Sequence, residues 1–69
     1  MALRTRVLEY LERKPSDFLT LSKELDIDIS SLAKELDVLL KAGYVTKTDN
    51  LFRLTDRGRE YLKVEKSGT

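Results

Sequence analysis

The spacing of apolar residues changes at Gly43, from every three or four residues before it to every second residue after it. Leu32, Leu36 and Leu39 recur at the spacing that places side chains on one face of a helix. The segment that follows, YVTKTDNLFRL, has the alternation typical of strands. Because glycine tolerates the left-handed conformation that commonly ends a helix, the sequence predicts a helix that stops at Gly43 and leads directly into a β-hairpin.

Asp49 and Asn50 are the predicted turn residues of this hairpin, since both tolerate positive φ. Counting outward from the turn pairs Thr48 with Leu51, Lys47 with Phe52, Thr46 with Arg53 and Val45 with Leu54. Strand alternation then puts one set of side chains on each face, with Val45, Phe52 and Leu54 on one and Thr46, Thr48 and Arg53 on the other. We therefore expect a hairpin with a buried side and a solvated side.

Three more helices are expected around this unit. Residues 2–14 have apolar side chains at helical spacing and end before Pro15, because the residue before proline is pushed out of the helical region. A brief second helix is expected with Thr20 as its N-cap, burying Leu21 and Leu25.

Capping residues also predict where the third and fourth helices begin. Asp28 precedes the third helix and Thr55 the fourth, and both side chains can accept the free amide hydrogens of a first turn. Asp56 favours the positive first turn of the fourth helix, in which Tyr61 and Leu62 should face inward. Gly58 would let that helix approach the hairpin closely.

The chain has 69 residues, with no cysteine and no histidine. This length supports one small domain, expected over residues 1–66 with 67–69 as a frayed tail. Disulfides, thiol chemistry and the usual zinc ligands are excluded, and we expect no enzyme, metal, cofactor or small-molecule ligand. The N-terminus lacks an apolar run that would form a signal peptide or membrane span, so we expect a cytoplasmic protein without a membrane partner.

The predicted order is helix, short strand or loop, helix, turn, helix, hairpin, helix, which is an α+β, mostly helical fold class. Within it, LSKELDIDISSLAKELDVLLKAGYV leads into the hairpin and LTDRGREYL follows it. From Thr20 to Leu62 the chain resembles winged helix-turn-helix DNA-binding proteins of the MarR, ArsR and PadR type and small archaeal-type winged-helix regulators. The resemblance implies a three-helix core, a two-stranded wing, a C-terminal helix, and transcription regulation on double-stranded DNA.

The resemblance also implies which surface binds DNA, with the helix of residues 29–42 in the major groove and the wing of residues 44–54 on the phosphate backbone. The nucleic-acid-binding residues so implied are Ser30, Ser31, Lys34, Glu35, Lys47 and Arg53. The two serines can donate to phosphates or base edges, or they merely start the helix. Ile29 could touch a thymine methyl group.

The charge distribution argues against a simple DNA-reading helix. Residues 21–42 carry three basic and five acidic side chains, whereas residues 43–69 carry six basic and four acidic. A carboxylate near phosphates weakens binding unless it accepts from cytosine or organises a neighbouring base-contacting side chain. Asp37 can pair with Lys41 in solvent. Glu35 therefore remains the main acidic side chain that argues against DNA binding by this helix. We therefore expect most of the electrostatic attraction to come from the wing.

Apolar residues outside the obvious core suggest two further hypotheses. A homodimer through the terminal helices would suit palindromic DNA, and its interface would use Leu3, Val7, Leu8, Tyr10, Tyr61 and Val64. Alternatively, the chain is a protein-interaction winged-helix module of a transcription, replication or membrane-remodelling assembly. The arginines near helix starts, Arg4, Arg6 and Arg57, either extend a DNA footprint or only solubilise the surface.

Overall fold

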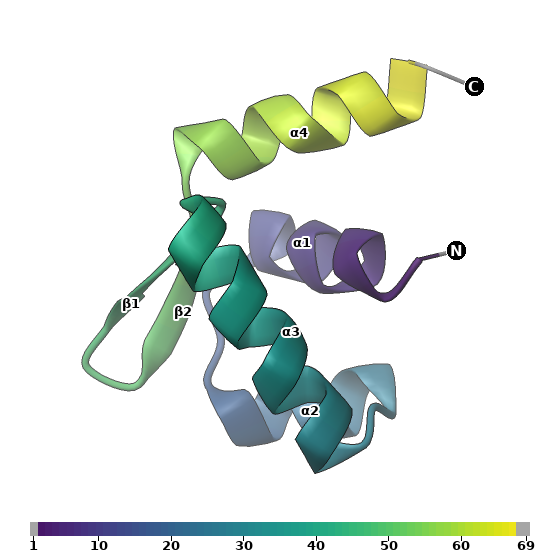
Figure 1. The fold of residues 1–69 in the computed structure, drawn as a ribbon. Helices are drawn as coiled ribbons and strands as arrows, with labels where there is room; N and C mark the ends of the chain where they lie inside the picture. Colours follow the sequence, from purple (N-terminus) through teal and green to yellow (C-terminus); the bar gives the residue numbers. More distant parts are fainter. Residues whose placement is uncertain (1, 68–69) are drawn as a thin grey trace.

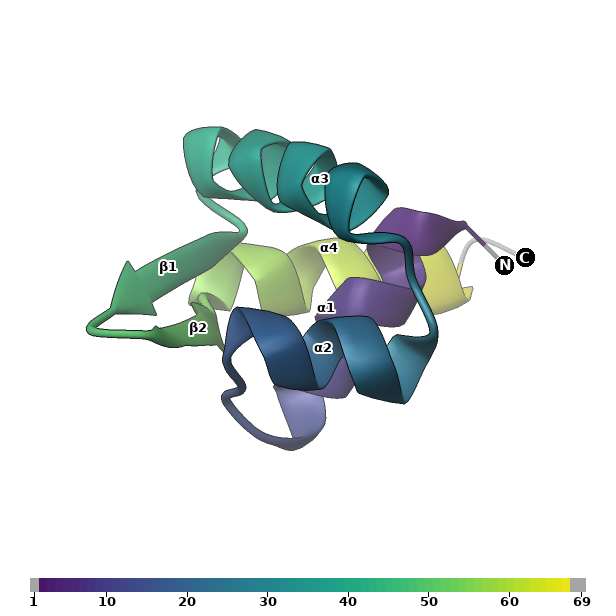
Figure 2. The same ribbon diagram turned by 90° about the horizontal axis from the view of Figure 1, so that it is seen from below.

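A computed structural model describes residues 2–67, which form four helices and one two-stranded antiparallel sheet (Figure 1). The elements in chain order are α1 (Leu3–Arg13), α2 (Phe18–Leu25), α3 (Ile29–Ala42), β1 (Val45–Thr48), β2 (Leu51–Leu54) and α4 (Asp56–Ser67). The hairpin of β1 and β2, the wing, projects on the side opposite the start of α1 and the end of α4 (Figures 1 and 2). The predicted element order and winged-helix architecture are confirmed.

One apolar core joins all of these elements. α1 lies at its centre, in contact with α2, α3, α4 and β2. The buried apolar residues are Val7, Leu8, Leu11, Leu21, Ile27, Leu32, Leu36, Leu39, Val45, Phe52, Leu54 and Leu62. Because full burial of one such side chain contributes roughly 1.5–3 kcal/mol, packing fixes the positions of α3 and the wing relative to each other.

α3 begins and ends where the sequence predicts. Oδ2 of Asp28 accepts a hydrogen bond from the amide of Ser31 at 3.0 Å, which confirms Asp28 as the N-cap. Gly43 ends the helix with φ of 82°, in the left-handed region. The amides of Gly43 and Tyr44 donate to the last carbonyls of α3, so the chain leaves the helix in a fixed direction toward β1.

The hairpin has the predicted register at all four residue pairs. Asp49 adopts a positive φ of 57° in the turn. On the other edge of β2, Ser16 forms an isolated antiparallel bridge with Phe52, through hydrogen bonds of 3.2 and 2.9 Å between their main chains. The loop after α1 therefore anchors the wing to the domain.

Thr55 and Gly58 connect the wing to α4. Oγ1 of Thr55 donates to the carbonyl of Gly43 at 2.6 Å and accepts from the amide of Gly58 at 3.0 Å, which confirms Thr55 as the N-cap. A Cβ at Gly58 would overlap the carbonyl oxygen of Tyr44 and lie 2.5 Å from Cδ1 of Leu54. Glycine is therefore required for α4 to approach the hairpin this closely.

α2 begins earlier than predicted. Its N-cap is Asp17, whose Oδ1 accepts from the amide of Thr20 at 2.8 Å, so the prediction that Thr20 caps the helix was wrong. A carboxylate makes a strong, charge-assisted cap, and the earlier start places Phe18 against the core. Leu21 is fully buried as predicted, whereas Leu25 at the end of the helix is only partly buried.

The C-terminal helix is also longer than expected. Ser67, predicted to belong to a frayed tail, is the last residue of α4, and its hydroxyl donates to the carbonyl of Lys63 at 2.7 Å. Residues 68–69 of that predicted tail lie outside the described residues. α4 therefore extends to residue 67.

The apolar face expected to meet a second copy is narrower than predicted. Val7 and Leu8 have no exposed surface. The reason is that α1 is covered from several sides by the other elements, so neither residue can contact another chain while the domain is folded. The members of the predicted interface that keep exposed surface are Leu3, Tyr10, Tyr61 and Val64.

Candidate nucleic-acid interface

α3 lies at the surface of the domain along its whole length (Figure 2). Its buried stripe of leucines faces α1 and the hairpin, and polar and small residues occupy the opposite side. We call the exposed set Ser30, Ser31, Lys34, Asp37, Val38 and Lys41 the outward face of α3. The remaining predicted contact on this helix, Glu35, does not belong to that face.

Glu35 is turned toward α1. Its Oε2 lies 2.7 Å from Nε of Arg4, and its side chain keeps only 15% of its surface exposed. The hydrogen bond to Glu35, followed by the attraction between the two charges, raises the pKa of Arg4 above its ordinary value. The main electrostatic argument against DNA binding by α3 is thereby weakened, because Arg4 already compensates the negative charge of Glu35.

The outward face carries two lysines against one aspartate. Oδ2 of Asp37 lies 3.0 Å from Nζ of Lys41, and both side chains are largely exposed, which confirms the predicted pair. An ion pair of this kind is weak and screened by salt. Lys34 is exposed and forms no ion pair within residues 2–67, so its charge is available to an external partner.

The two serines differ in their surroundings. The hydroxyl of Ser31 donates to Oδ2 of Asp28 at 3.2 Å, beside the amide bond that caps the helix. Ser31 therefore takes part in starting α3, as one of the two interpretations of the serines held. Ser30 is exposed next to it. Both side chains lie at the N-terminal end of the outward face, where backbone amides also favour anions.

The wing places its two predicted contacts on opposite faces. Lys47 pairs with Phe52 in the sheet, and its Nζ lies 5.5 Å from the centre of the Phe52 ring. It therefore borders a shallow cavity of about 220 Å³ between the wing, α2 and α3. Arg53 lies on the other face, with Thr46 and Thr48. The structure brings Lys47 toward α3 and leaves Arg53 on the outer side of the wing.

The three arginines considered for a wider footprint all have contacts inside the domain. Arg4 binds Glu35, as described above, and Arg6 donates to the carbonyl of Leu25 at 2.5 Å, which links α1 to the end of α2. The guanidinium of Arg57 lies 5.6 Å from the centre of the Tyr44 ring. These contacts join residues that are far apart in the sequence, so the residue pattern did not reveal them.

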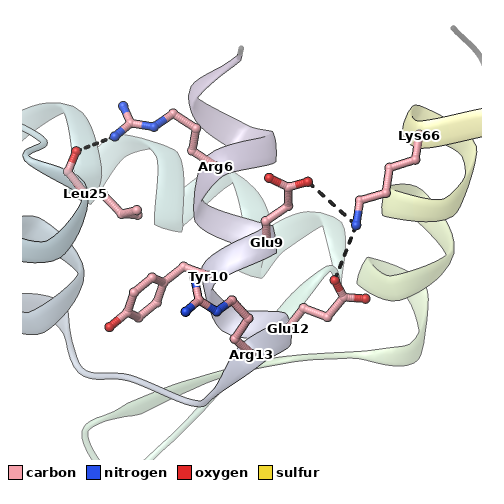
Figure 3. Close-up of a pocket in the computed structure, with 7 residues that line it drawn as sticks. All are labelled: Arg6, Glu9, Tyr10, Glu12, Arg13, Leu25 and Lys66. Carbon is pink, nitrogen blue, oxygen red and sulfur yellow. Dashed lines mark hydrogen bonds and ion pairs between the residues drawn. The ribbon is translucent and has the colours of Figure 1, made fainter.

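A separate depression of about 490 Å³ lies on α1 between α2 and α4 (Figure 3). Charged side chains dominate its lining, and many of them bind one another. Nζ of Lys66 lies 3.7 Å from carboxylate oxygens of both Glu9 and Glu12, and Arg6 reaches across to α2. These contacts hold α1 against its two neighbours, so we assign this depression a structural role.

Within residues 2–67, no helix has the length and apolar character needed to cross a membrane. The same residues contain no group of acidic side chains arranged to hold a metal ion.

Comparison with known proteins gave one informative result. Searches of curated proteins and of solved structures found no match to the chain. A family model described as winged helix-turn-helix matches residues 3–67, which cover all four helices and the wing. Proteins with this fold typically bind DNA rather than catalyse a reaction. The chain belongs to the winged helix-turn-helix family of DNA-binding domains.

Proposed function

We propose that the protein is a transcriptional regulator that binds double-stranded DNA with α3 in the major groove and the wing on the phosphate backbone. The nucleic-acid contacts in this proposal are Ser30, Ser31, Lys34, Lys47 and Arg53. Glu35 acts indirectly, by holding Arg4 and α1 against α3. Such a regulator works in the compartment that holds the DNA.

One observation carries the proposal more than any other. The inward side of α3 is tied to α1 by Glu35 and Arg4, while Lys34 stands exposed on the outward face. A partner that approaches this face meets Lys34, which forms no ion pair in the described part of the chain, whereas the Glu35 carboxylate is turned toward α1 and paired with Arg4. Phosphate oxygens and the acceptor atoms of guanine suit such a cation.

The wing supports the same orientation. Lys47 lies on the side of the hairpin that faces α2 and α3, and Arg53 with two threonines lies on the outer side. When α3 enters a major groove, the adjacent wing meets the sugar-phosphate backbone. Its cations and hydroxyl groups are the types of side chain that donate to phosphate.

A salt titration of binding to random-sequence duplex DNA tests this proposal, with salt varied over about 50–200 mM. We expect the affinity to fall steeply with salt, because phosphate contacts release counterions. Lys47→Ala and Arg53→Ala should each lower the slope of log K against log salt by about one unit. Lys63→Ala, which removes an exposed lysine from α4, is the matched control and should leave the slope unchanged.

Lys34→Ala should behave differently from the wing variants. Because Lys34 lies on the outward face of α3, its loss should reduce the preference for a selected site over random DNA, by about 1–3 kcal/mol if the lysine contacts a base. If all three lysine and arginine variants bind DNA as the wild type does, DNA is not the partner of this surface.

A protein-interaction module is the second candidate, and the exposed apolar surface at the start of α2 favours it. Leu19 is 62% exposed, and with Phe18 and Phe52 it lines a cavity of about 240 Å³ beside the wing. Leu19→Ser separates the two functions. Under our proposal this variant keeps the salt-dependent DNA binding of the wild type, since Leu19 supplies no charge to phosphates.

We also propose that the regulator is a homodimer, with Leu3, Tyr10, Tyr61 and Val64 at the interface. Val64 is 65% exposed, and the Tyr61 ring packs against the Tyr44 ring at a tilt of 35°, with ring centres 5.0 Å apart. A two-fold dimer would place two copies of α3 on a palindromic site. Sedimentation should show a species of twice the 8.0 kDa chain mass, and Val64→Glu should dissociate it. A wild-type protein that remains at 8.0 kDa at high micromolar concentration would contradict the dimer.

A further inference from the structure

Val38 is an apolar side chain on an otherwise polar surface. It is 46% exposed on the outward face of α3. Lys34 precedes it by four residues and Ser31 by seven, so the three side chains follow one another along the helix surface. Lys41 follows one turn later. Any partner that reaches Lys34 and Ser31 therefore also covers Val38.

Other exposed apolar residues do not share this position. Exposure of single apolar side chains is ordinary in a small domain, and Leu19 and Val64 are examples on α2 and α4. Ile29 is 59% exposed, but it precedes Ala33 and Leu36 by four and seven residues, so it lies on a different side of α3 from Lys34 and Lys41. Val38 alone among these residues lies between the two lysines of the outward face.

The neighbours of Val38 permit close approach. Ser31, seven residues before Val38 on the same side of the helix, is small, and valine itself is short and restricted in its side-chain rotation. The backbone of α3 can therefore come near the floor of a groove along this side, where the larger exposed side chains are the flexible Lys34 and Lys41 and the Asp37 carboxylate paired with Lys41. A short, stiff apolar group at this place fits a small apolar group on the partner.

The major groove of unmodified DNA offers one apolar group on its base edges, the 5-methyl group of thymine. We infer that Val38 contacts this methyl group, so that the preferred DNA site carries a thymine at the matching position of each half-site. The inference rests on the proposed function, because it assumes that α3 enters the major groove. The thymine methyl group is then the chemical feature that the outward face recognises, and Val38 is the residue that contacts it.

The test is a double-mutant cycle on the full chain with a DNA site selected from random duplexes. Each thymine of the site is replaced in turn by deoxyuridine, which removes only the methyl group. At one position per half-site, wild-type affinity should fall about fourfold, which corresponds to about 0.8 kcal/mol for one buried methyl group. Val38→Ala should lower affinity for the thymine site and bind the thymine and deoxyuridine sites equally.

Two controls distinguish loss of the thymine contact from loss of folding and from general effects of removing a valine. Alanine favours helix more than valine does, so Val38→Ala should fold, and its helical circular dichroism and melting curve verify this. Val64→Ala, a matched change at an exposed valine on α4, should keep the fourfold ratio between the two sites.

Three results are distinguishable. Loss of the thymine preference in Val38→Ala alone supports the inference. Site-specific binding that ignores every deoxyuridine replacement, or a thymine preference that survives in Val38→Ala, overturns the inference and leaves the DNA-binding function intact. Absence of salt-dependent binding to any duplex overturns the proposed function and the inference together.

Discussion

The helix-turn-helix segment, residues 17–42, and the wing, residues 45–54, use their charges in opposite ways. Acidic side chains outnumber basic ones in the helix-turn-helix segment, yet three of its six acidic side chains cap a helix or pair with an arginine of α1. Asp17 and Asp28 cap α2 and α3, and Glu35 binds Arg4. In the wing, Lys47 and Arg53 stand at exposed positions on the two faces of the hairpin.

This difference shows why net charge is a poor guide to the surface that a small domain offers. A carboxylate that accepts hydrogen bonds from helix amides or from a guanidinium is compensated locally. A lysine on a strand that forms no ion pair leaves more of its charge to act on the field outside the protein. The segment with the negative total can therefore present a face that is suited to DNA.

The largest effect is expected where the two regions meet, at Gly58. Gly58→Val should destabilise the domain by about 3 kcal/mol, because the new side chain overlaps the Tyr44 carbonyl and the Leu54 side chain. Glu60→Val, at an exposed position of α4, places a valine in the same helix without the overlap and should cost about 0.5 kcal/mol. Urea unfolding measures the free energy of unfolding of both variants. Equal stability of the two variants would show that α4 does not press against the wing.

A smaller effect should distinguish a capping carboxylate from a surface one. Asp28→Ala removes the acceptor for the first turn of α3 and should cost about 1 kcal/mol. Asp37→Ala removes only an exposed pair with Lys41 and should cost less than about 0.5 kcal/mol. Free energies of unfolding from chemical denaturation show which of the two variants loses more stability. A larger loss for Asp37→Ala would contradict the division of acids into structural and surface groups.

The cap of α2 adds a pH dependence. Hydrogen bonds from Thr20 lower the pKa of Asp17 below its ordinary value of 3.8. The pKa in the folded state is therefore below that of the unfolded state, so the stabilisation is present above the unfolded pKa and is lost as pH falls through the folded pKa. Asp17→Asn keeps a capping side chain without titrating. Unfolding free energies of the two proteins should converge in acid, and a gap independent of pH would contradict the capping role.

Asp37 also offers a direct contrast in DNA binding. Its side chain is 61% exposed on the outward face, whereas that of Glu35 is 15% exposed against α1. Asp37→Asn should strengthen binding to random duplex DNA by a few fold, because it removes a negative charge near the phosphates. Fluorescence anisotropy at low salt measures this gain. A weaker complex would show that Asp37 itself contacts the DNA as an acceptor.

Much of the fold was predictable because its determinants are local. The hairpin register followed from the position of Asp49 and the strand alternation, and both were confirmed. The caps Asp28 and Thr55 lie next to the helices that they start. The one capping error, at α2, arose because two suitable residues stand three positions apart, and the choice between them depends on how Phe18 packs.

The candidate site was less predictable because its geometry depends on distant contacts. Arg4 and Glu35 are 31 residues apart, and helical periodicity gives no sign that they meet. The same periodicity assigned α1 one buried stripe, although burial of Val7 and Leu8 shows that the helix is covered on more than one side. Strand alternation predicted the face of Arg53, yet only the fold shows that Lys47 lies on the opposite face, beside α3.

The pairing of Glu35 with Arg4 is the central claim of this account, and a double-mutant cycle on DNA affinity tests it most directly. Arg4→Ala releases the Glu35 carboxylate and should weaken binding about eightfold at roughly 0.1 M salt, the equivalent of one phosphate contact. Glu35→Gln alone should change affinity by less than about twofold, because the charge that it removes is already compensated.

The double variant Arg4→Ala, Glu35→Gln decides between the possible causes of that loss. We predict that it binds DNA as tightly as Glu35→Gln does, since no free carboxylate remains beside α3. Affinity that stays about eightfold weak in the double variant would mean that Arg4 itself contacts DNA. A Glu35→Gln variant that binds several-fold more tightly than the wild type would show that the carboxylate faces the phosphates and would contradict the account.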